Sequence, residues 1–283
     1  MYEKAILIFG YGKWSQKVLG FLKKSKSFDS IYIKTSSKFF KIYPKKTEIN
    51  FKEFKNQIEN FKYLHICTPT KSHFGIIKNN NLNNKKIIIE KPLVKRKVDL
   101  DNIKHFFKLN KIIVNYIDLY NPLLLKIKKR INLIQNLNID FGNNKLYLNK
   151  YDCLNEWLDH PLAIILYLSK KFTSFKIIYY ENIKIKKKYF EKLHLNYRFK
   201  NISINIKINM KFPKSYRILS EEKKSITKKI NLKQIPKELN LNSINLLYGD
   251  LKSEKKNYFQ KFNFHKKIFL EKQKIKKNIS EKR

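Results

Sequence analysis

The sequence of 283 residues is poor in cysteine, glycine and proline, with two, six and seven of these residues respectively. Two cysteines, Cys67 and Cys153, are too few for a disulfide framework. They also lack metal-ligand spacing, so no metal site is predicted. The longest apolar runs, such as Ala5–Phe9 and Ile87–Ile89, are far too short to span a bilayer. The N-terminus enters an apolar segment without a small-residue cleavage site, so no secretory signal is predicted. Together these absences predict a cytoplasmic protein without a membrane partner.

Acidic residues are also scarce, because 22 Asp and Glu stand against 63 Lys and Arg, a formal net charge of +41. One interpretation is a nucleic-acid-binding protein, since clustered cations neutralise phosphates and release counterions. The other is a biased genome, because the excess is mostly Lys and accompanies many residues with A/T-rich codons. The lysines are spread along the chain and arginine is scarce, which favours the second interpretation. No specific nucleic-acid partner is predicted, although non-specific attraction to polyanions follows from the charge.

Apolar residues, in contrast, are sufficient for buried cores, at 42% of the chain. Over the first 120 residues, short apolar runs alternate with helix-like segments. The runs predict strands at Ala5–Phe9, Ile31–Ile33, Tyr63–Cys67, Lys86–Ile89 and Lys111–Asn115. Helices are predicted at Lys13–Lys24, Phe51–Phe61, His73–Asn79 and Leu100–Lys108. This alternation predicts an α/β domain with a doubly wound parallel sheet over residues 1–120.

The pattern changes after Asn121-Pro122. Helices are predicted at Leu123–Ile134 and Glu156–Ser169, with a strand near Lys145–Leu148 between them. Extended segments follow at Ser174–Tyr180, Lys192–Phe199 and Ile202–Met210, and the last stretch, Glu254–Arg283, is predicted to be helical. Alternation of period two within the extended segments is typical of antiparallel strands with one wet face. Residues 121–283 are therefore predicted to form a smaller α+β domain with a mostly antiparallel sheet.

The first candidate site lies between the first predicted strand and helix, at Phe9-Gly10-Tyr11-Gly12-Lys13-Trp14-Ser15. In a Rossmann domain the first glycine makes a tight turn, and the second admits the pyrophosphate to the helix N-terminus. Gly10 and Gly12 fit these positions, and Ser15 stands at the third, where a small residue allows close packing. The candidate cofactor-binding residues in this turn are Gly10, Gly12, Lys13, Trp14 and Ser15. An ordinary strand–turn–helix connection is the alternative.

The acidic residue that usually binds the ribose hydroxyls after the second strand is missing. Lys34-Thr35-Ser36-Ser37-Lys38 stands at that place. Hydroxyl groups and cations suit a 2′-phosphate, so Thr35 and Ser36 are candidate cofactor contacts and NADP is slightly favoured over NAD. Two lysines in a loop of so Lys-rich a chain carry little weight, so both cofactors stay open.

Two further motifs follow, Cys67-Thr68-Pro69-Thr70 with His73, and Ile89-Glu90-Lys91-Pro92-Leu93. With the glycine turn they resemble the Gfo/Idh/MocA oxidoreductase family, whose pattern runs GxGxxG, TPxxxH and EKP. Two segments resemble the connection between that family's two domains, Val114-Asn115-Tyr116 and Leu119-Tyr120-Asn121-Pro122. Glu156-Trp157-Leu158-Asp159-His160 resembles the family's D-x-x-x-H motif, and the order of all five motifs matches.

The resemblance implies an enzyme that moves a hydride between a nicotinamide, NADP or NAD, and a hydroxyl-bearing carbon of a sugar or nucleotide sugar. It implies that Lys91 binds the reacting oxygen, that His160 is the base and that Glu156 assists His160. An unperturbed imidazole titrates near pH ~6.5, which suits proton transfer at neutral pH. The other implied cofactor contacts are Thr68, Pro69, His73 and Glu90, with Lys91 beside the nicotinamide. A homo-oligomer is expected on the same ground.

The chain departs from the family pattern at three points. Glu156 replaces the Asp, Ser15 replaces the third glycine, and the substrate domain is shorter than usual. A catalytically impaired member that binds dinucleotide as a structural or sensing ligand is therefore an alternative. Taken alone, a histidine such as His160 is more often a structural residue than a catalytic base, and a helix-capping role explains His73 equally well.

Overall fold

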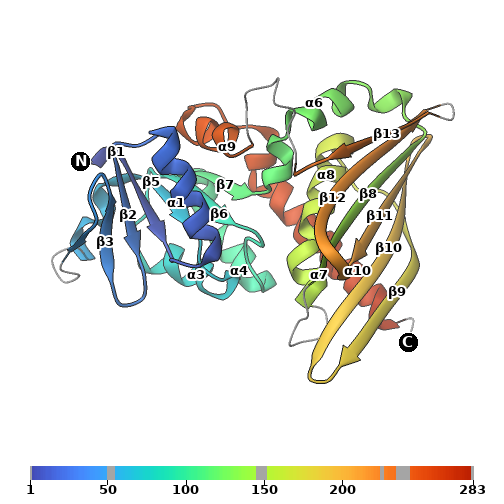
Figure 1. Ribbon diagram of the computed structural model, residues 1–283, viewed down its shortest axis with the longest axis horizontal. Helices are drawn as coiled ribbons and strands as arrows, with labels where there is room; N and C mark the ends of the chain where they lie inside the picture. Colours follow the sequence, from blue (N-terminus) through green and yellow to red (C-terminus); the bar gives the residue numbers. More distant parts are fainter. Residues whose placement is uncertain (1, 50–54, 145–151, 224–225, 234–242, 282–283) are drawn as a thin grey trace. The chain divides into compact units, whose positions relative to one another are not determined.

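The computed structural model describes residues 2–49, 55–144, 152–223, 226–233 and 243–281 (Figure 1). The chain forms two compact units of similar size, Met1–Asn115 with Ile244–Lys266, and Tyr116–Ser243 with Lys267–Arg283. The predicted second domain takes in all of residues 121–283, whereas Ile244–Lys266 pack within the first unit.

The first unit is built on a seven-stranded sheet in the order β4-β3-β2-β1-β5-β6-β7. Strands β2, β1, β5, β6 and β7 run parallel, which confirms the doubly wound parallel sheet. Strands β3 and β4 add an antiparallel hairpin beside β2, which the sequence analysis misses because lysines interrupt its apolar pattern. The strands are β1 (Tyr2–Phe9), β2 (Ser30–Lys34), β3 (Phe39–Tyr43), β4 (Thr47–Ile49), β5 (Phe61–Ile66), β6 (Lys86–Glu90) and β7 (Lys111–Asn115).

Short helices connect these strands, and two of the predicted helices differ from those observed. Where a helix is predicted over Phe51–Phe61, the described part is a 3-10 helix, η1 (Lys55–Asn60), and residues 51–54 lie outside the described residues. The predicted helix Leu100–Lys108 is divided into three short turns, α4, η2 and α5. The helices are α1 (Lys13–Ser25), α3 (Thr70–Asn79), α4 (Lys97–Asn102), η2 (Ile103–His105), α5 (Phe106–Leu109), α9 (Ser243–Lys252) and η6 (Tyr258–Gln260).

Helix α9 packs on the same sheet although it is distant in sequence. Tyr248 of α9 is fully buried, and its ring lies 6.4 Å from that of Phe21 in α1 and 6.1 Å from that of Phe28. Its hydroxyl lies 2.6 Å from Nδ1 of His65 in β5. Burial of one tyrosine side chain among aromatic rings stabilises such a contact by about 1.5–3 kcal/mol, which explains why α9 belongs to the first unit.

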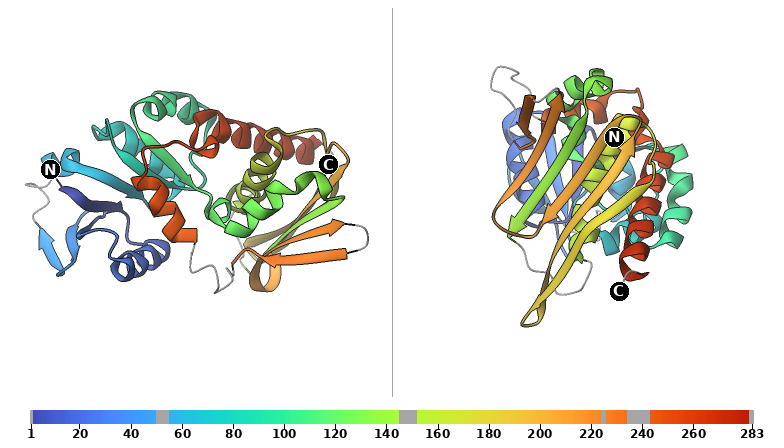
Figure 2. Two further views of the ribbon diagram at one scale, coloured as in Figure 1. Left: turned by 90° about the horizontal axis from the view of Figure 1, so that it is seen from above. Right: turned by 90° about the vertical axis from the view of Figure 1, so that its right-hand side faces the viewer.

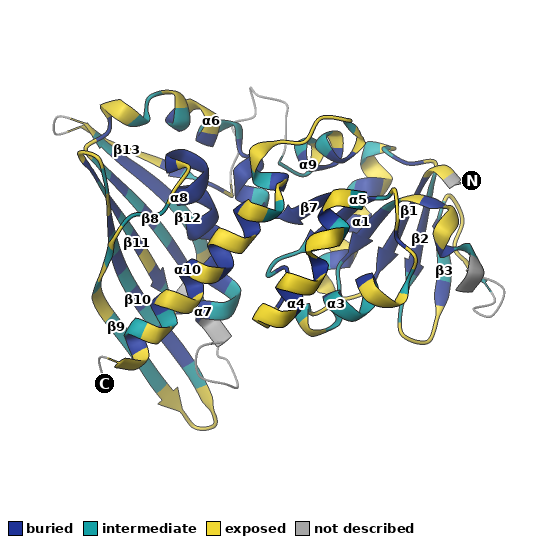
Figure 3. Cartoon of the chain, turned by 180° about the vertical axis from the view of Figure 1, so that it is seen from behind, coloured by how far each residue is buried: buried dark blue, intermediate teal, exposed yellow. Residues whose placement is uncertain are grey.

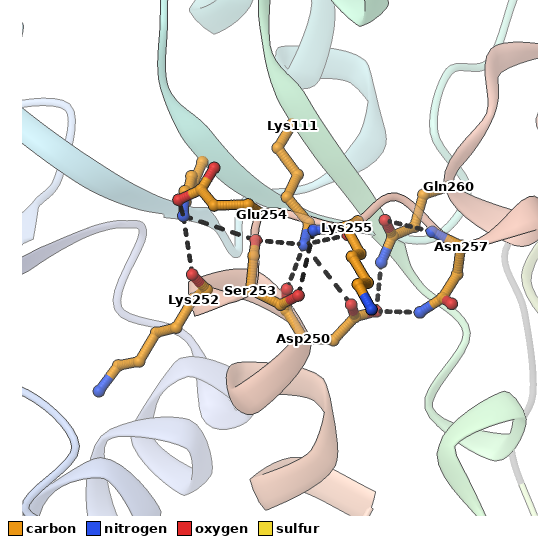
Figure 4. Close-up of polar contacts among 9 residues, drawn as sticks. Lys111, Asp250, Lys252, Ser253, Glu254, Lys255, Asn257 and Gln260 are labelled. Carbon is orange, nitrogen blue, oxygen red and sulfur yellow. Dashed lines mark hydrogen bonds and ion pairs between the residues drawn. The ribbon is translucent and has the colours of Figure 1, made fainter.

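Two buried lysines hold the C-terminal end of α9 against the sheet (Figure 4). Lys86 and Lys111 lie opposite each other at the first positions of β6 and β7. The Lys86 ammonium donates to the carbonyl of Lys252, and Lys111 donates to three more carbonyls, those of Asp250, Ser253 and Lys255. Cations at a helix C-terminus satisfy its last carbonyls and interact favourably with its dipole.

The second unit contains a six-stranded sheet in the order β13-β12-β8-β11-β10-β9, and only the β8–β11 pair is parallel. This confirms the mostly antiparallel sheet. The predicted strand Lys145–Leu148 lies outside the described residues, and β8 precedes it. The strands are β8 (Asn136–Asn144), β9 (Phe175–Ile185), β10 (Lys188–Phe199), β11 (Ile202–Asn209), β12 (Lys211–Lys223) and β13 (Ile226–Asn231).

Helices α8 and α10 cover one face of this sheet (Figure 2). Along β11, Ile202, Ile204 and Ile206 are buried and alternate with half-buried Ser203 and Asn205, so one face is apolar and the other polar. Every residue of α8 is buried, whereas α10 carries an exposed stripe along one side (Figure 3). The remaining helical segments are η3 (Ile117–Tyr120), α6 (Pro122–Lys129), η4 (Ile131–Leu133), α7 (Asp152–Trp157), α8 (Asp159–Ser169) and α10 (Phe262–Glu281).

None of the described helices combines the length and the apolar character that crossing a membrane requires.

Candidate dinucleotide site and buried histidine site

The turn after β1 has the conformation that its glycines predict. Gly10 has φ of +97°, which side chains of L residues rarely adopt. A Cβ at Gly10 would also lie 3.1 Å from Cγ2 of Thr68 and 3.2 Å from the carbonyl oxygen of Cys67. The amide of Gly10 donates to the carbonyl of Lys34 at 2.7 Å, which ties the turn to the end of β2. Gly10 is therefore required by the protein backbone itself.

Gly12 has a different role, because nothing in the protein crowds it. It is the N-cap of α1 in an extended conformation, no side chain caps the helix, and a Cβ there would meet no atom within 4 Å. The first turn of α1, which begins with exposed Lys13 and half-buried Trp14, therefore presents amide groups beside an open glycine. Ser15 is fully buried and its hydroxyl donates to the Gly12 carbonyl at 2.8 Å, so this position does favour a small residue.

Glu90, at the end of β6, accepts three hydrogen bonds on one oxygen. Oε1 receives the indole N–H of Trp14 at 2.6 Å and the amide of Asn115 at 2.7 Å, and it lies 2.9 Å from Nε2 of His65. Burial alone would raise the pKa of Glu90, but the hydrogen bond and charge of His65, with Asn115 and Trp14, outweigh it and lower that pKa. Glu90 is thereby held ionised where β5, β6 and β7 end.

His65 in β5 and Cys67, which directly follows that strand, complete this cluster. The ligand-type atoms of His65, Cys67 and Glu90 lie within 4.8 Å of one another. Both ring nitrogens of His65 are already engaged, by Glu90 and by the Tyr248 hydroxyl, and burial raises the pKa of the Cys67 thiol. Hydrogen bonding therefore accounts for the cluster. Sequence reasoning missed His65 and Tyr248, because 183 residues separate them and no local pattern connects them.

Two buried polar atoms of the first unit lack a hydrogen-bond partner among the described residues. These are the hydroxyl of Thr68 and Oδ1 of Asn115, both fully buried atoms. A buried polar group without a partner costs about 1–3 kcal/mol, so such atoms are where a bound ligand gains most. Pro69 next to Thr68 is exposed and begins α3 as its N-cap residue.

His73 connects the two motifs that flank it. Its ring nitrogens lie 2.8 Å from the carbonyl of Thr68 and 3.1 Å from that of Leu93, and the side chain is fully buried. Burial lowers the pKa of His73, although both carbonyl contacts oppose that effect. His73 thus links the Thr68-Pro69 turn to the loop after β6, and its predicted contact with the cofactor stays a prediction.

Lys91 directly follows β6 and is half buried, and its peptide bond to Pro92 is cis. The basic loop after β2 forms a tight turn, in which the Thr35 amide donates to the Lys38 carbonyl at 2.8 Å and the Lys38 amide donates to the Thr35 hydroxyl at 2.9 Å. Ser36 is exposed at the tip of this turn. The Thr35 hydroxyl is therefore engaged within the loop, while Ser36 is open to solvent.

In the second unit, the carboxylate of Asp118 lies beside His160 of α8 and also pairs with the guanidinium of Arg217. Nδ1 of His160 lies 2.9 Å from Oδ2 of Asp118 in η3. Nη1 of Arg217 in β12 donates to both oxygens of Asp118 at 3.0 Å. Sequence reasoning missed both Asp118 and Arg217. No sequence motif pointed to them, because they come from separate elements.

The two carboxylates closest to His160 in sequence are placed differently. Asp159 pairs with the ammonium of Lys272 in α10, and both side chains are buried. Glu156 is half buried near the end of α7, and a turn at Leu158 separates α7 from α8. The role of Glu156 as the partner of His160 stays a prediction.

Comparison with known proteins identifies the first unit. Residues 4–116 match the profile of the Gfo/Idh/MocA group, described as an oxidoreductase family with an NAD-binding Rossmann fold. The resemblance drawn from the motifs is thereby confirmed for this part of the chain. No curated protein sequence matches the chain.

Solved structures share the fold over nearly the whole chain. A dehydrogenase (MviM) from Clostridium difficile matches with a TM-score of 0.68 at 15% identity, over 97% of this chain and 99% of that one. The UDP-N-acetylglucosamine 3-dehydrogenase GnnA from Acidithiobacillus ferrooxidans matches at 0.66 and 10%, over 97% of each chain. The WlbA (WbpB) dehydrogenase from Thermus thermophilus, in complex with NAD and UDP-GlcNAcA, matches at 0.60 and 11%, over 95% and 94%. At such identities these matches show a common fold.

Proposed function

We propose that this chain, whose first unit is an NAD-binding Rossmann domain of the Gfo/Idh/MocA type, transfers a hydride between a nicotinamide and a hydroxyl-bearing carbon of a sugar or nucleotide sugar. The observation that carries the proposal is the uncapped N-terminus of α1 beside the uncrowded Gly12. Support for the substrate class comes from GnnA, named for UDP-N-acetylglucosamine, and from WlbA, solved with a UDP sugar acid.

The described residues fit a dinucleotide. The amides of Lys13, Trp14 and Ser15 would bind the pyrophosphate, since a helix N-terminus attracts anions and Gly12 leaves room for them. The buried hydroxyl of Thr68 and Oδ1 of Asn115 are the unsatisfied groups that a ligand would complete.

Cofactor preference is proposed to favour NADP slightly. No acid follows β2, and the turn instead carries the exposed Ser36, Ser37 and Lys38. Hydroxyl and ammonium groups suit a 2′-phosphate, whereas the ribose hydroxyls of NAD usually meet a carboxylate. Lys38 also lies 3.8 Å from Glu48, an exposed pair that contributes little to stability.

In the proposed reaction, the hydride and the proton of the substrate go to different groups. A bound oxidised nicotinamide would supply the hydride acceptor. Lys91 would hydrogen-bond to the reacting oxygen and stabilise the developing alkoxide. His160 would take the hydroxyl proton as base, with Glu156 assisting it, and a carbonyl would form on the substrate. In the reverse direction the imidazolium returns the proton.

The test is a titration of the full chain with NADPH and with NADH, followed by nicotinamide fluorescence at low and at high salt. Gly12→Ala should leave the fold intact and weaken binding at least tenfold, because the new methyl group occupies the space of the pyrophosphate. Gly20→Ala is the matched control, since Gly20 lies exposed in the same helix with equal space around it. Binding that disappears at high salt in every variant would report only the charge of the chain and would refute the proposal.

Turnover is tested with the same protein on a panel of UDP sugars, including UDP-N-acetylglucosamine. His160→Asn should abolish turnover while the affinity for NADPH stays nearly unchanged. Tight cofactor binding without turnover on any hydroxylated substrate would instead favour the alternative of a catalytically silent dinucleotide-binding protein.

A further inference from the structure

A cluster of one carboxylate, one imidazole and one guanidinium lies entirely within the second unit. Asp118, His160 and Arg217 come from η3, α8 and β12, and their side chains are 3%, 2% and 18% exposed. No sequence motif connects these three residues, and only the fold places them together.

We propose that Asp118 is the positioning residue of His160, fixing its imidazole with Nδ1 protonated and Nε2 as the nitrogen that exchanges protons, and that Arg217 holds Asp118 ionised for this purpose. The kinetic part of this inference rests on the proposed function, whereas the protonation pattern of His160 does not.

The first argument is the contact at Nδ1. Asp118 Oδ2 lies 2.9 Å from that nitrogen, a distance at which the negative carboxylate attracts a proton on Nδ1. A carboxylate accepts hydrogen bonds and cannot donate them, so the proton of a neutral imidazole is favoured on Nδ1. The lone pair then lies on Nε2, and a proton taken there produces an imidazolium that Asp118 stabilises.

The second argument is the way Arg217 is held. Its guanidinium carbon lies 5.6 Å from the ring centre of Phe141 and 5.5 Å from that of Trp157, within the range of cation–π contacts. Both oxygens of Asp118 lie 3.0 Å from the same Nη1. A cation fixed in this way keeps the carboxylate charged although it is buried, and it limits the directions in which the carboxylate can turn.

The third argument is the state of the neighbouring charges. Asp159, the residue before His160, is paired with Lys272, so that buried carboxylate is already neutralised. Tyr116 also lies near Asp159, and burial together with that charge raises the pKa of its hydroxyl well above the ordinary value, so Tyr116 stays neutral. Asp118 is thus a carboxylate whose contact with His160 is direct and whose charge is retained.

The protonation pattern can be read by NMR in the full chain labelled with 15N-histidine. Comparison with His160→Gln assigns the His160 signals among the six histidines. In the parent, the neutral imidazole of His160 should show its proton on Nδ1. In Asp118→Asn, this preference should be lost and the imidazole should titrate at lower pH, because the stabilising anion is gone. A parent spectrum with the proton on Nε2, or identical titrations in parent and variant, would overturn the proposal.

Two further variants separate positioning from mere structure. Asp140→Asn makes the same change in β8, whose Asp140 side chain lies away from this cluster, and should leave the His160 signals unchanged. The double variant Asp118→Asn with Arg217→Gln removes the anion together with its main cation. If Asp118 serves only to satisfy Arg217, the double variant regains the parent pattern and the proposal fails; if Asp118 positions His160, the pattern stays altered. If Asp118→Asn does not fold, the parent spectrum still tests the proposal, because it shows whether the proton of the neutral imidazole is on Nδ1 or on Nε2.

Kinetics then tests the role in turnover. With UDP-N-acetylglucosamine or another accepted UDP sugar, Asp118→Asn should lower kcat by about 10²–10⁴-fold with little change in KM. The acidic limb of the pH profile should also move to lower pH. Full activity in the variant would overturn the positioning role. A parent that turns over nothing would refute the proposed function and leave the NMR result standing.

Discussion

Acid titration of Asp118 offers a quantitative test of the buried cluster. Burial alone would raise the pKa of this carboxyl, but the charges and hydrogen bonds of Arg217 and His160 outweigh it and lower the pKa from 3.8 to about 2. The difference of about 1.8 between these pKa values, at about 1.36 kcal/mol for each unit, corresponds to about 2 kcal/mol of folding stability.

The sign follows from the lowered pKa. A carboxyl whose pKa is lower in the folded state stabilises the fold fully above its unfolded pKa of 3.8, and this stability is lost as the pH falls through about 2. About half of the 2 kcal/mol should be lost by pH 3. Asp118→Asn should be less stable than the parent by about 3 kcal/mol at pH 6, since the largely buried Arg217 guanidinium loses its anion and His160 loses its neighbouring carboxylate. The gap between the two proteins should narrow by about 1 kcal/mol between pH 6 and pH 3.

The assay uses the two tryptophans of the chain. Trp14 lies in the first unit and Trp157 in the second, so a Trp14→Phe background reports urea unfolding of the second unit by fluorescence. Asp140→Asn is a control of opposite sign. Burial raises the pKa of Asp140, only partly opposed by Lys207, His194 and Lys229, so the parent should gain stability relative to this variant as the pH falls. If the difference in free energy of unfolding between the parent and Asp118→Asn stays constant from pH 6 to pH 3, Asp118 is not an ionised carboxylate stabilised by Arg217.

Two other predictions concern the first unit. Gly10→Ala should lower the free energy of unfolding by about 1–3 kcal/mol, because φ of +97° and the close Thr68 methyl both oppose a Cβ. Thermal denaturation of this variant, compared with that of Gly12→Ala, checks the prediction. Equal stability of the two variants would contradict it. Lys111→Met should speed amide hydrogen exchange of α9, because three backbone carbonyls lose their donor. Exposed Lys108→Met is its control in mass-spectrometric exchange, and unchanged protection of α9 in Lys111→Met would show that the lysine does not anchor the helix.

Local physics determined much of the fold from the sequence. Short continuous apolar runs identified the strands of the parallel sheet, and period-two alternation identified β10 and β11, because both patterns are local properties of each strand. The glycine turn was recognised for a similar reason. Gly10 needs a positive φ and Gly12 borders open space, and both requirements arise within a few residues. Motif order then identified the family of the first unit.

Only the tertiary structure determined which polar groups meet. Glu90 receives Trp14 and Asn115 from elements 76 and 25 residues away, and α9 returns to the first unit through Tyr248 and two buried lysines. The neighbours of His160 are likewise set by packing, which brings Asp118 and Arg217 to it from η3 and β12. A buried charge needs a partner wherever the chain can supply one, and local periodicity carries no information about which distant residue that is. The sequence alone therefore determined the type of fold and the cofactor turn, while the charge environment of the proposed base was decided by long-range contacts.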